Sequence, residues 1–207
     1  MFLSQIIFNL RNAKVLSELK NPYELHRTIL KAFPIDLPES ERVLYRVETR
    51  QQTAFSLPVI VQSQTQPNWC YLERNDLVVA PVQIKIFEPN FLVGQTLVFR
   101  LLANPTKRNK ENGKRVGVHK KEELYQWIQR KVTVGGANLL FVTIESHGNV
   151  SGVKYQGEVQ FNLHHLGVCF DGQIHISDPK KFANLLYKGV GSAKAFGFGL
   201  LSIALLH

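Results

Sequence analysis

The hydrophobic pattern of the first half of the chain predicts four strands and one clear helix. The strands are expected at residues 1–9, 42–48, 58–63 and 81–87, the helix at residues 21–33, and a weaker helical turn near residues 71–79. Asn21 is a favourable N-cap, Pro22 suits the first position of a helix, and Pro34 ends it. The order strand, helix, strand, strand, helix, strand is that of the ferredoxin-like fold.

The second half of the chain repeats this order of elements. Strands are expected at residues 95–103, 139–144, 157–170, 173–177 and 200–206, and helices at residues 120–132 and 178–187. The stretch 157–170 can be one long strand or a hairpin, and the polar stretch 104–117 is expected to form a loop. The sequence therefore predicts an α+β protein of two tandem ferredoxin-like (βαββαβ) domains, residues 1–88 and 95–207.

The helix predicted at residues 21–33 has one apolar face and one reactive face. With about 100° per residue, its apolar side chains fall on one side and form the predicted buried stripe: Leu25, Ile29, Ala32 and Phe33. The remaining face carries a phenol, an imidazole, a guanidinium and an ammonium, from Tyr23, His26, Arg27 and Lys31. His26 is expected at the border between this face and the buried stripe.

This set of side chains suits cleavage of RNA without a metal ion. In such a reaction a 2′-hydroxyl loses a proton and the leaving 5′-oxygen gains one, and histidine, which titrates near neutrality, can serve either step. A cation such as Lys31 or Arg27 would stabilise the extra negative charge on phosphorus, and tyrosine can hydrogen-bond the hydroxyl or stack on a base. A histidine beside a tyrosine on a solvated helix face is also common, so this spacing alone leaves both interpretations open.

Positive charge is concentrated in the second half of the chain. The protein carries 25 basic and 16 acidic residues, a net charge of +9, and residues 100–131 hold ten basic residues against three acidic ones. Such clustering favours a nucleic-acid partner whose binding weakens with salt. The basic residues of the predicted loop at residues 104–117 are expected to contact backbone phosphates. A solvated surface loop is the alternative interpretation.

A glycine-rich segment, GVGSAKAFGFGLL at residues 189–201, precedes the last predicted strand. Gly189 and Gly191 would let the backbone approach an anion closely, and Lys194 within the segment favours a phosphate contact. The spacing matches neither a P-loop nor a dinucleotide-binding fingerprint. The alternative is a tight turn from a helix into the last strand.

Metal sites, cofactors and membrane anchors find no support in the sequence. Cys70 and Cys169 lie far apart without metal-binding spacing, and His164 and His165 are strand neighbours that point to opposite faces, so with His175 they are not expected to chelate a metal. No apolar run approaches the roughly 20 residues that span a bilayer, and the N-terminal apolar run precedes the first basic residue, the reverse of a signal peptide. We therefore expect a cytoplasmic protein without metal, cofactor or membrane contact.

Several segments, taken in order, resemble the CRISPR-associated CasE family. They are NPYELHRTILKAFP, LYRVE, PVIVQS, FRLLANPTKR, GKRVGV and GVGSAKAFGFGLLSIALL, and the resemblance runs from Met1 to His207. CasE is the repeat-processing subunit of the type I-E Cascade complex. The resemblance implies a metal-independent endoribonuclease with tandem ferredoxin-like domains, which binds CRISPR repeat stem-loop RNA and other Cascade subunits.

The resemblance also implies a reaction and a set of roles. The RNA would be cut at the 3′ base of the repeat stem-loop by 2′-hydroxyl attack, leaving 2′,3′-cyclic phosphate and 5′-hydroxyl ends, and the processed RNA would stay bound. His26 carries over as the catalytic histidine, with Tyr23 and Lys31 in support. The stem would be gripped by the basic loop, through Lys107, Arg108, Lys114 and Arg115, and by a hairpin within Val150–Phe170, in which Lys154 is the only basic residue. The alternatives are a non-catalytic CRISPR repeat-RNA-binding subunit and a purely structural subunit.

Overall fold

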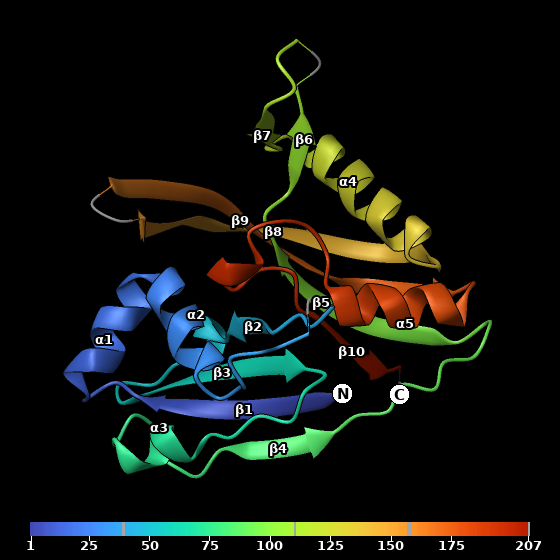
Figure 1. Cartoon of the computed structure of the whole chain (residues 1–207). Helices are drawn as coiled ribbons and strands as arrows, with labels where there is room; N and C mark the ends of the chain where they lie inside the picture. The colour runs from blue at the N-terminus through green and yellow to red at the C-terminus, as the bar shows by residue number, and fades with distance from the viewer. Residues whose placement is uncertain (39, 110, 157–158, 207) are drawn as a thin grey trace. The chain divides into compact units, whose positions relative to one another are not determined.

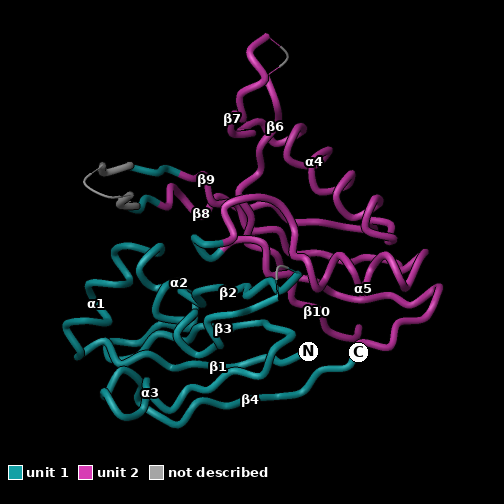
Figure 2. Tube along the Cα trace, in the orientation of Figure 1, with its two compact units in different colours: residues 1–88, 151–164, 195–197 teal, residues 89–150, 165–194, 198–207 magenta. Residues whose placement is uncertain are grey.

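The computed structural model describes residues 1–38, 40–109, 111–156 and 159–206. The chain forms two compact units (Figure 2), each of which combines helices with an antiparallel sheet. Unit 1 comprises residues 1–88, 151–164 and 195–197, and unit 2 comprises residues 89–150, 165–194 and 198–207. Unit 1 therefore takes two of its three segments from the second half of the chain.

The sheet of unit 1 has the strand order β2-β3-β1-β4 (Figure 1). Its strands are β1 (Phe2–Asn9), β2 (Leu44–Val47), β3 (Ser56–Ser63) and β4 (Gln83–Ile86), which confirm the four strands predicted in this half. All neighbours are antiparallel, with Ile6 opposite Val59 and Tyr45 opposite Val61. The connections contain α1 (Ala13–Lys20), α2 (Pro22–Leu30), the 3-10 turn η1 (Thr49–Gln51) and α3 (Cys70–Arg74).

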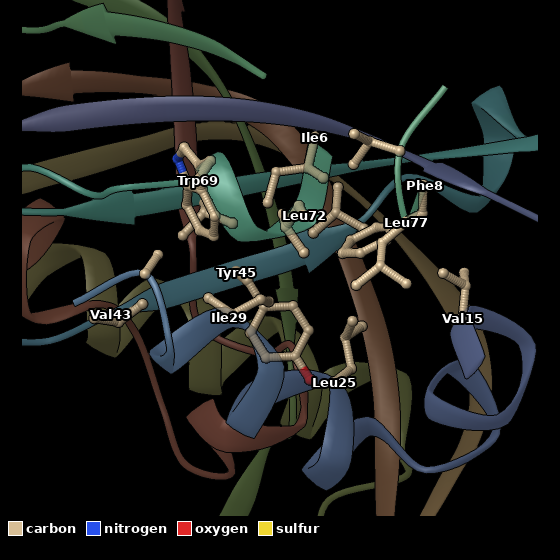
Figure 3. Close-up of a cluster of buried hydrophobic side chains, with 14 of the residues drawn as sticks. Ile6, Phe8, Val15, Leu25, Ile29, Val43, Tyr45, Trp69, Leu72 and Leu77 are labelled. Carbon is tan, nitrogen blue, oxygen red and sulfur yellow. The ribbon is translucent and has the colours of Figure 1, made fainter. Parts of the chain in front are cut away.

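The core of unit 1 joins the sheet to its helices (Figure 3). Ile6 of β1, Tyr45 of β2 and Leu72 of α3 are buried in one cluster with the apolar face of α2. The stripe predicted for this helix is confirmed, since its four members are all buried: Leu25, Ile29, Ala32 and Phe33. Because this stripe fixes the rotation of α2, the side chains of Tyr23 and His26 are held at the edge of the core and in reach of solvent.

Unit 1 contains a helix that the sequence did not predict. Only Val15 of α1 is fully buried, so its hydrophobic period is too weak to indicate a helix. The side chain of Asn12 caps α1 by accepting hydrogen bonds from the backbone N–H groups of Lys14 and Val15. The α2 helix ends earlier than predicted, at Leu30, and the following three residues form a tighter turn with i→i−3 hydrogen bonds.

Asn21 is the N-cap residue of α2, as predicted, but its side chain does not cap the helix. The side chain makes no capping hydrogen bond. Its amide instead donates to the carbonyl of Val153 at 3.0 Å and accepts from the N–H of Val153 at 3.1 Å, within unit 1. Val153 lies on β8 (Ala137–Gln156). The Asn21 side chain therefore binds a residue that is distant in the sequence and not the first turn of α2.

The sheet of unit 2 has the strand order β10-β5-β9-β8. Besides β8 it contains β5 (Thr96–Ala103), β9 (Val159–Ile176) and β10 (Leu201–Leu205). The strands predicted separately at residues 157–170 and 173–177 are both part of β9, and β8 runs well beyond its predicted end at residue 144. Polar residues and glycine around Ser146–Gly152 carry little strand propensity, but pairing in a long hairpin keeps them extended. The distal parts of β8 and β9, from residue 151 to residue 164, belong to unit 1.

The helices of unit 2 are α4 (Lys121–Val134) and α5 (Pro179–Lys188), both as predicted. Trp127 of α4 stacks on Phe170 of β9 with ring centroids 5.7 Å apart, which anchors the helix on the sheet. Asp178 caps α5 through the N–H of Lys181, as its sequence indicates. The stretch predicted as a loop contains a short hairpin of β6 (Thr106–Arg108) and β7 (Arg115–Gly117), and the 3-10 turn η2 (Lys194–Phe196) precedes β10.

Candidate functional site

The reactive face of α2 places Tyr23 and His26 one helical turn apart near its first residues. Both side chains are half-buried, whereas Arg27 and Lys31 are exposed. Arg27 forms an ion pair with Glu24, with Nη1 3.1 Å from Oε2. Two of the four predicted residues, Tyr23 and His26, are therefore held by the protein, and the other two extend into solvent.

The imidazole of His26 lies against the ring of Tyr45. The ring centroids are 6.0 Å apart and the ring planes differ by 26°, so the rings are nearly parallel. Burial lowers the pKa of His26 to about 4 because it penalises the charged imidazolium. His26 is therefore neutral near pH 7 in the free protein, which suits it to accept a proton.

Tyr45 is completely buried behind His26, and no pattern in the sequence singles it out beyond its place in a strand. Its hydroxyl donates to the carbonyl of Pro22 at 2.8 Å and lies 3.3 Å from the carbonyl of Ala195. Gly197 adopts a φ of +83°, and a Cβ there would come within 3.1 Å of the Tyr45 ring. Burial raises the pKa of the Tyr45 phenol above its usual range, so the phenol stays protonated and remains a donor.

Tyr23 faces a second aromatic ring from the glycine-rich segment. Its ring centroid is 6.2 Å from that of Phe196, at an angle of 35°. A Cβ at Gly152 on β8 would lie 2.7 Å from the ring of Phe196 and 2.9 Å from Oδ1 of Asn21. The start of α2, residues 195–197 and the hairpin strand β8 thus meet around Tyr23 within unit 1.

Lys31 lies at the other end of α2, where it is the C-cap residue. It follows His26 by five residues, which corresponds to about 7.5 Å along the helix axis and about 140° around it. The ammonium and the imidazole are thus at opposite edges of the solvent face. A bound group must extend across this face to contact both.

The basic residues of unit 2 differ in how far their charges are offset. Nζ of Lys107 is 2.8 Å from Oε2 of Glu123, and the hydrogen bond from Lys107 lowers the pKa of this carboxyl. Arg108, Lys114 and Arg115 are exposed.

Lys131 was not among the predicted contacts, although it lies in the basic stretch. Burial is the largest cause that lowers the pKa of Lys131, and the positive charges of Arg130 and Arg115 lower it further. Arg115 of β7 and the end of α4 therefore form a group of like charges in unit 2. Lys154 lies on β8, but its side chain is outside the described part of the structure.

The glycine-rich segment turns the chain from α5 towards β10. Gly189 ends α5 with a φ of +70°, and Gly191, with a φ of +88°, lies against Trp127, where a Cβ would be 3.3 Å from the indole. The N–H of Val190 donates to the carbonyl of Gly199, and the N–H of Gly199 donates to the carbonyl of Leu102. The first part of the segment is thus a tight turn packed on unit 2, with Lys194 at its end.

The three histidines considered as metal ligands have separate neighbours. His164 is 2.8 Å from the hydroxyl of Ser151, His165 is 3.2 Å from the Asn104 amide, and His175 is 3.4 Å from the Thr96 hydroxyl. Among the described residues, no group of three histidine, cysteine, aspartate or glutamate side chains could hold a metal ion. No helix in the described part of the chain is long and apolar enough to span a membrane.

Comparisons with known proteins give one consistent result. Residues 1–204 match the family described as CRISPR associated protein. The chain is 36% identical to the CRISPR-associated endoribonuclease Cse3 of Thermus thermophilus, over 99% of this chain and 100% of that protein. It is 31% identical to the CRISPR system Cascade subunit CasE of Escherichia coli, over 99% of both. The structure of Cse3 bound to a 19-nucleotide RNA matches with a TM-score of 0.87 and 36% identity, over 99% of this chain and 100% of that one. This chain therefore belongs to the CRISPR-associated protein family that includes Cse3 and CasE.

Proposed function

We propose that this protein is a metal-independent endoribonuclease that cuts CRISPR precursor RNA at the 3′ base of the repeat stem-loop and keeps the product bound within a Cascade complex. The observation that carries the proposal is the half-buried, neutral His26 one turn from Tyr23, in a chain similar from end to end to a named CRISPR endoribonuclease. The RNA-bound state of that relative supports RNA as the ligand.

His26 acts as the general base in this proposal. Its neutral imidazole removes the proton from the 2′-hydroxyl, and the 2′-oxygen attacks the adjacent phosphorus. The 5′-oxygen leaves with the electron pair of its bond to phosphorus and takes up a proton through the Tyr23 hydroxyl. The ends produced are a 2′,3′-cyclic phosphate and a 5′-hydroxyl, and the step consumes no water.

Lys31 stabilises the negative charge that develops on phosphorus, and Arg27 contacts the neighbouring backbone. The separation of Lys31 from His26 along α2 supports a substrate that lies along the solvent face of the helix. A phosphate bound between them would raise the pKa of His26, because a nearby anion favours the imidazolium. The active pKa in the complex would then lie closer to neutrality than that of the free protein.

The RNA stem is bound by basic residues of the second half of the chain. The contacts proposed from the sequence are Lys107, Arg108, Lys114, Arg115, Lys154 and Lys194. Gly189 and Gly191 form the turn that precedes Lys194 and are part of the same proposed contact. The like charges around Lys131 support Arg115 in particular, since a phosphate would relieve their repulsion. Lys107 is the weaker candidate because Glu123 already offsets its charge.

We also propose that residues 1–88 and 95–207 each form a ferredoxin-like domain. The strand orders β2-β3-β1-β4 and β10-β5-β9-β8 support this, because they are equivalent when each unit's strands are numbered in sequence. In this arrangement α2 and α4 occupy corresponding places, after the first strand of each unit.

A cleavage assay with defined RNA ends tests the proposal. Labelled repeat stem-loop RNA is incubated with the protein in EDTA, and we expect one cut with 2′,3′-cyclic phosphate and 5′-hydroxyl ends. The variant His26→Ala should bind the RNA but cut at least ~100-fold more slowly, as expected for loss of a general base. An intact, shifted RNA with the unaltered protein would instead support a binding subunit, and products with free 3′-hydroxyl ends would contradict the mechanism.

A further inference from the structure

Tyr45 contacts His26 on the side of the imidazole that faces the core. The two rings are nearly parallel, and Tyr45 is completely buried while His26 is only partly so. Among the described side chains, none forms a hydrogen bond with the imidazole of His26. The orientation of this ring thus depends on packing, and the nearly parallel ring of Tyr45 is its buried neighbour, with centroids 6.0 Å apart.

The hydroxyl of Tyr45 connects the first turn of α2 to the glycine-rich segment. It donates to the carbonyl of Pro22 at 2.8 Å, with the carbonyl of Ala195 as a second acceptor at 3.3 Å. Helical geometry directs the backbone N–H of His26 to the carbonyl four residues earlier, which is that of Pro22. The carbonyl of Pro22 therefore accepts hydrogen bonds from both the Tyr45 hydroxyl and the backbone N–H of His26.

The space around the Tyr45 ring is adapted to it on a further side. Gly197 has a φ of +83°, which side chains other than glycine rarely adopt, and a Cβ there would crowd the ring at 3.1 Å. The ring is consequently enclosed by α2, by its own strand β2 and by Gly197. The ring of Tyr45 therefore has little freedom to move, and it forms a fixed neighbour for the imidazole of His26.

We infer that Tyr45 is a positioning residue, whose ring sets the plane of the His26 imidazole and shields it from water and whose hydroxyl fixes the first turn of α2. This inference rests on the proposed endoribonuclease function. A displacement of the imidazole by even a fraction of an ångström would slow proton transfer without weakening the RNA grip. The role differs from that of an ordinary core tyrosine, which would affect stability alone.

Tyr71 offers a matched control for this distinction. Its hydroxyl also donates to a carbonyl of α2, that of Thr28, but among the described residues its ring does not stack on His26. Burial likewise raises the pKa of the Tyr71 phenol above its usual range. The substitutions Tyr45→Phe and Tyr71→Phe each remove one hydroxyl bonded to the same helix.

The experiment measures single-turnover cleavage, RNA affinity and thermal unfolding for the unaltered protein and both variants. We expect Tyr45→Phe to lower the cleavage rate by about tenfold or more with RNA affinity within about twofold, because a misplaced catalytic group slows the chemical step. Tyr71→Phe should lower the melting temperature by a similar amount and leave the cleavage rate nearly unchanged. Equal losses of rate in the two variants would overturn the inference.

A second measurement does not depend on cleavage. In the free protein, NMR titration of labelled histidine gives the pKa of His26, assigned by the signal that disappears in His26→Gln. We expect Tyr45→Leu to raise the pKa of His26 by at least one unit, since water would reach the imidazole. Tyr71→Leu should leave the pKa of His26 unchanged. An unchanged pKa in Tyr45→Leu would contradict the inference even if the protein cuts RNA. A protein that does not cut but shows the shift would instead contradict only the proposed function.

Discussion

At the scale of single residues, burial lowers the pKa of His26 and also makes the fold sensitive to acid. The imidazole is held neutral by burial against Tyr45, with a pKa of about 4. Histidine in an unfolded chain titrates near 6.5. The desolvation that keeps the imidazole neutral near pH 7 therefore links protonation to unfolding.

Stability should accordingly fall as the pH is lowered from about 6.5 to about 4. In this window the unfolded chain binds a proton at His26 that the folded chain does not, so the free energy of unfolding decreases. Above the window both states are neutral at this position, and the contribution is constant. The expected loss is at most about 3 kcal/mol, measured by urea unfolding at a series of pH values. His26→Gln should flatten this part of the profile, and an equally steep profile in that variant would refute the assignment.

Lys31 should affect the rate of cleavage more than the affinity for RNA. Lys31→Gln is expected to lower the single-turnover rate by about tenfold and to change RNA affinity little, because its charge acts mainly on the developing phosphorane. Lys31→Arg should restore part of the rate. Lys14→Gln serves as the control, because this exposed lysine lies on α1 and pairs with Glu18. If Lys31→Gln weakened binding as much as it slowed cleavage, Lys31 would be an ordinary phosphate contact.

At the scale of helices and strands, local patterns predicted what local forces decide. The buried stripe of α2 and the cap of α5 by Asp178 follow from spacing and from neighbouring N–H groups, and both were predicted. Asn21 is the predicted N-cap residue, but its side chain does not cap α2 because the amide pairs with Val153, 132 residues away. Tyr45 was overlooked for the same reason, since its carbonyl partner at Ala195 is 150 residues distant. No local pattern in a single sequence carries such contacts.

The pairing of Asn21 with Val153 should hold the hairpin strand β8 to the start of α2. Asn21→Ala removes both hydrogen bonds, and we expect faster hydrogen exchange at Val153, equivalent to about 1–2 kcal/mol of local stability. Cleavage should slow in parallel if the hairpin helps to align the RNA. Hydrogen exchange followed by mass spectrometry or NMR provides the measurement.

Asn12→Ala is the matched control for this element. It also removes an asparagine at a helix start, but one that caps α1 through Lys14 and Val15. We expect it to lower the free energy of global unfolding by about 1 kcal/mol. The difference between this free energy and that of local opening at Val153 should stay unchanged. Indistinguishable exchange profiles of the two variants would show that Asn21 does not hold the hairpin.

At the scale of the whole molecule, the net charge of +9 is the property that most affects encounter with RNA. Its distribution matters more than its size. Lys107 pairs with Glu123 and Arg100 with Asp171, so two of the basic residues in the 100–131 stretch already have acidic partners. Arg115, Arg130 and Lys131 instead lie close enough for the two arginines to lower the pKa of Lys131. Like charges kept together cost stability, and a bound RNA backbone would offset that cost.

The salt dependence of RNA binding should therefore distinguish Arg115 from Lys107. Each phosphate contact that is lost should reduce the slope of log K against log salt concentration by about 0.7 to 0.9. We expect Arg115→Gln to reduce the slope by nearly this amount, because its charge is repelled by its neighbours and free to bind phosphate. Lys107→Gln should reduce it much less, because Glu123 neutralises this lysine before RNA arrives. The measurement is a series of binding titrations at increasing salt with a repeat stem-loop and, for comparison, an unrelated duplex of equal length. Equal slopes for the two variants would mean that RNA displaces Glu123 from Lys107, and the like-charged group around Lys131 would then have no special part in binding.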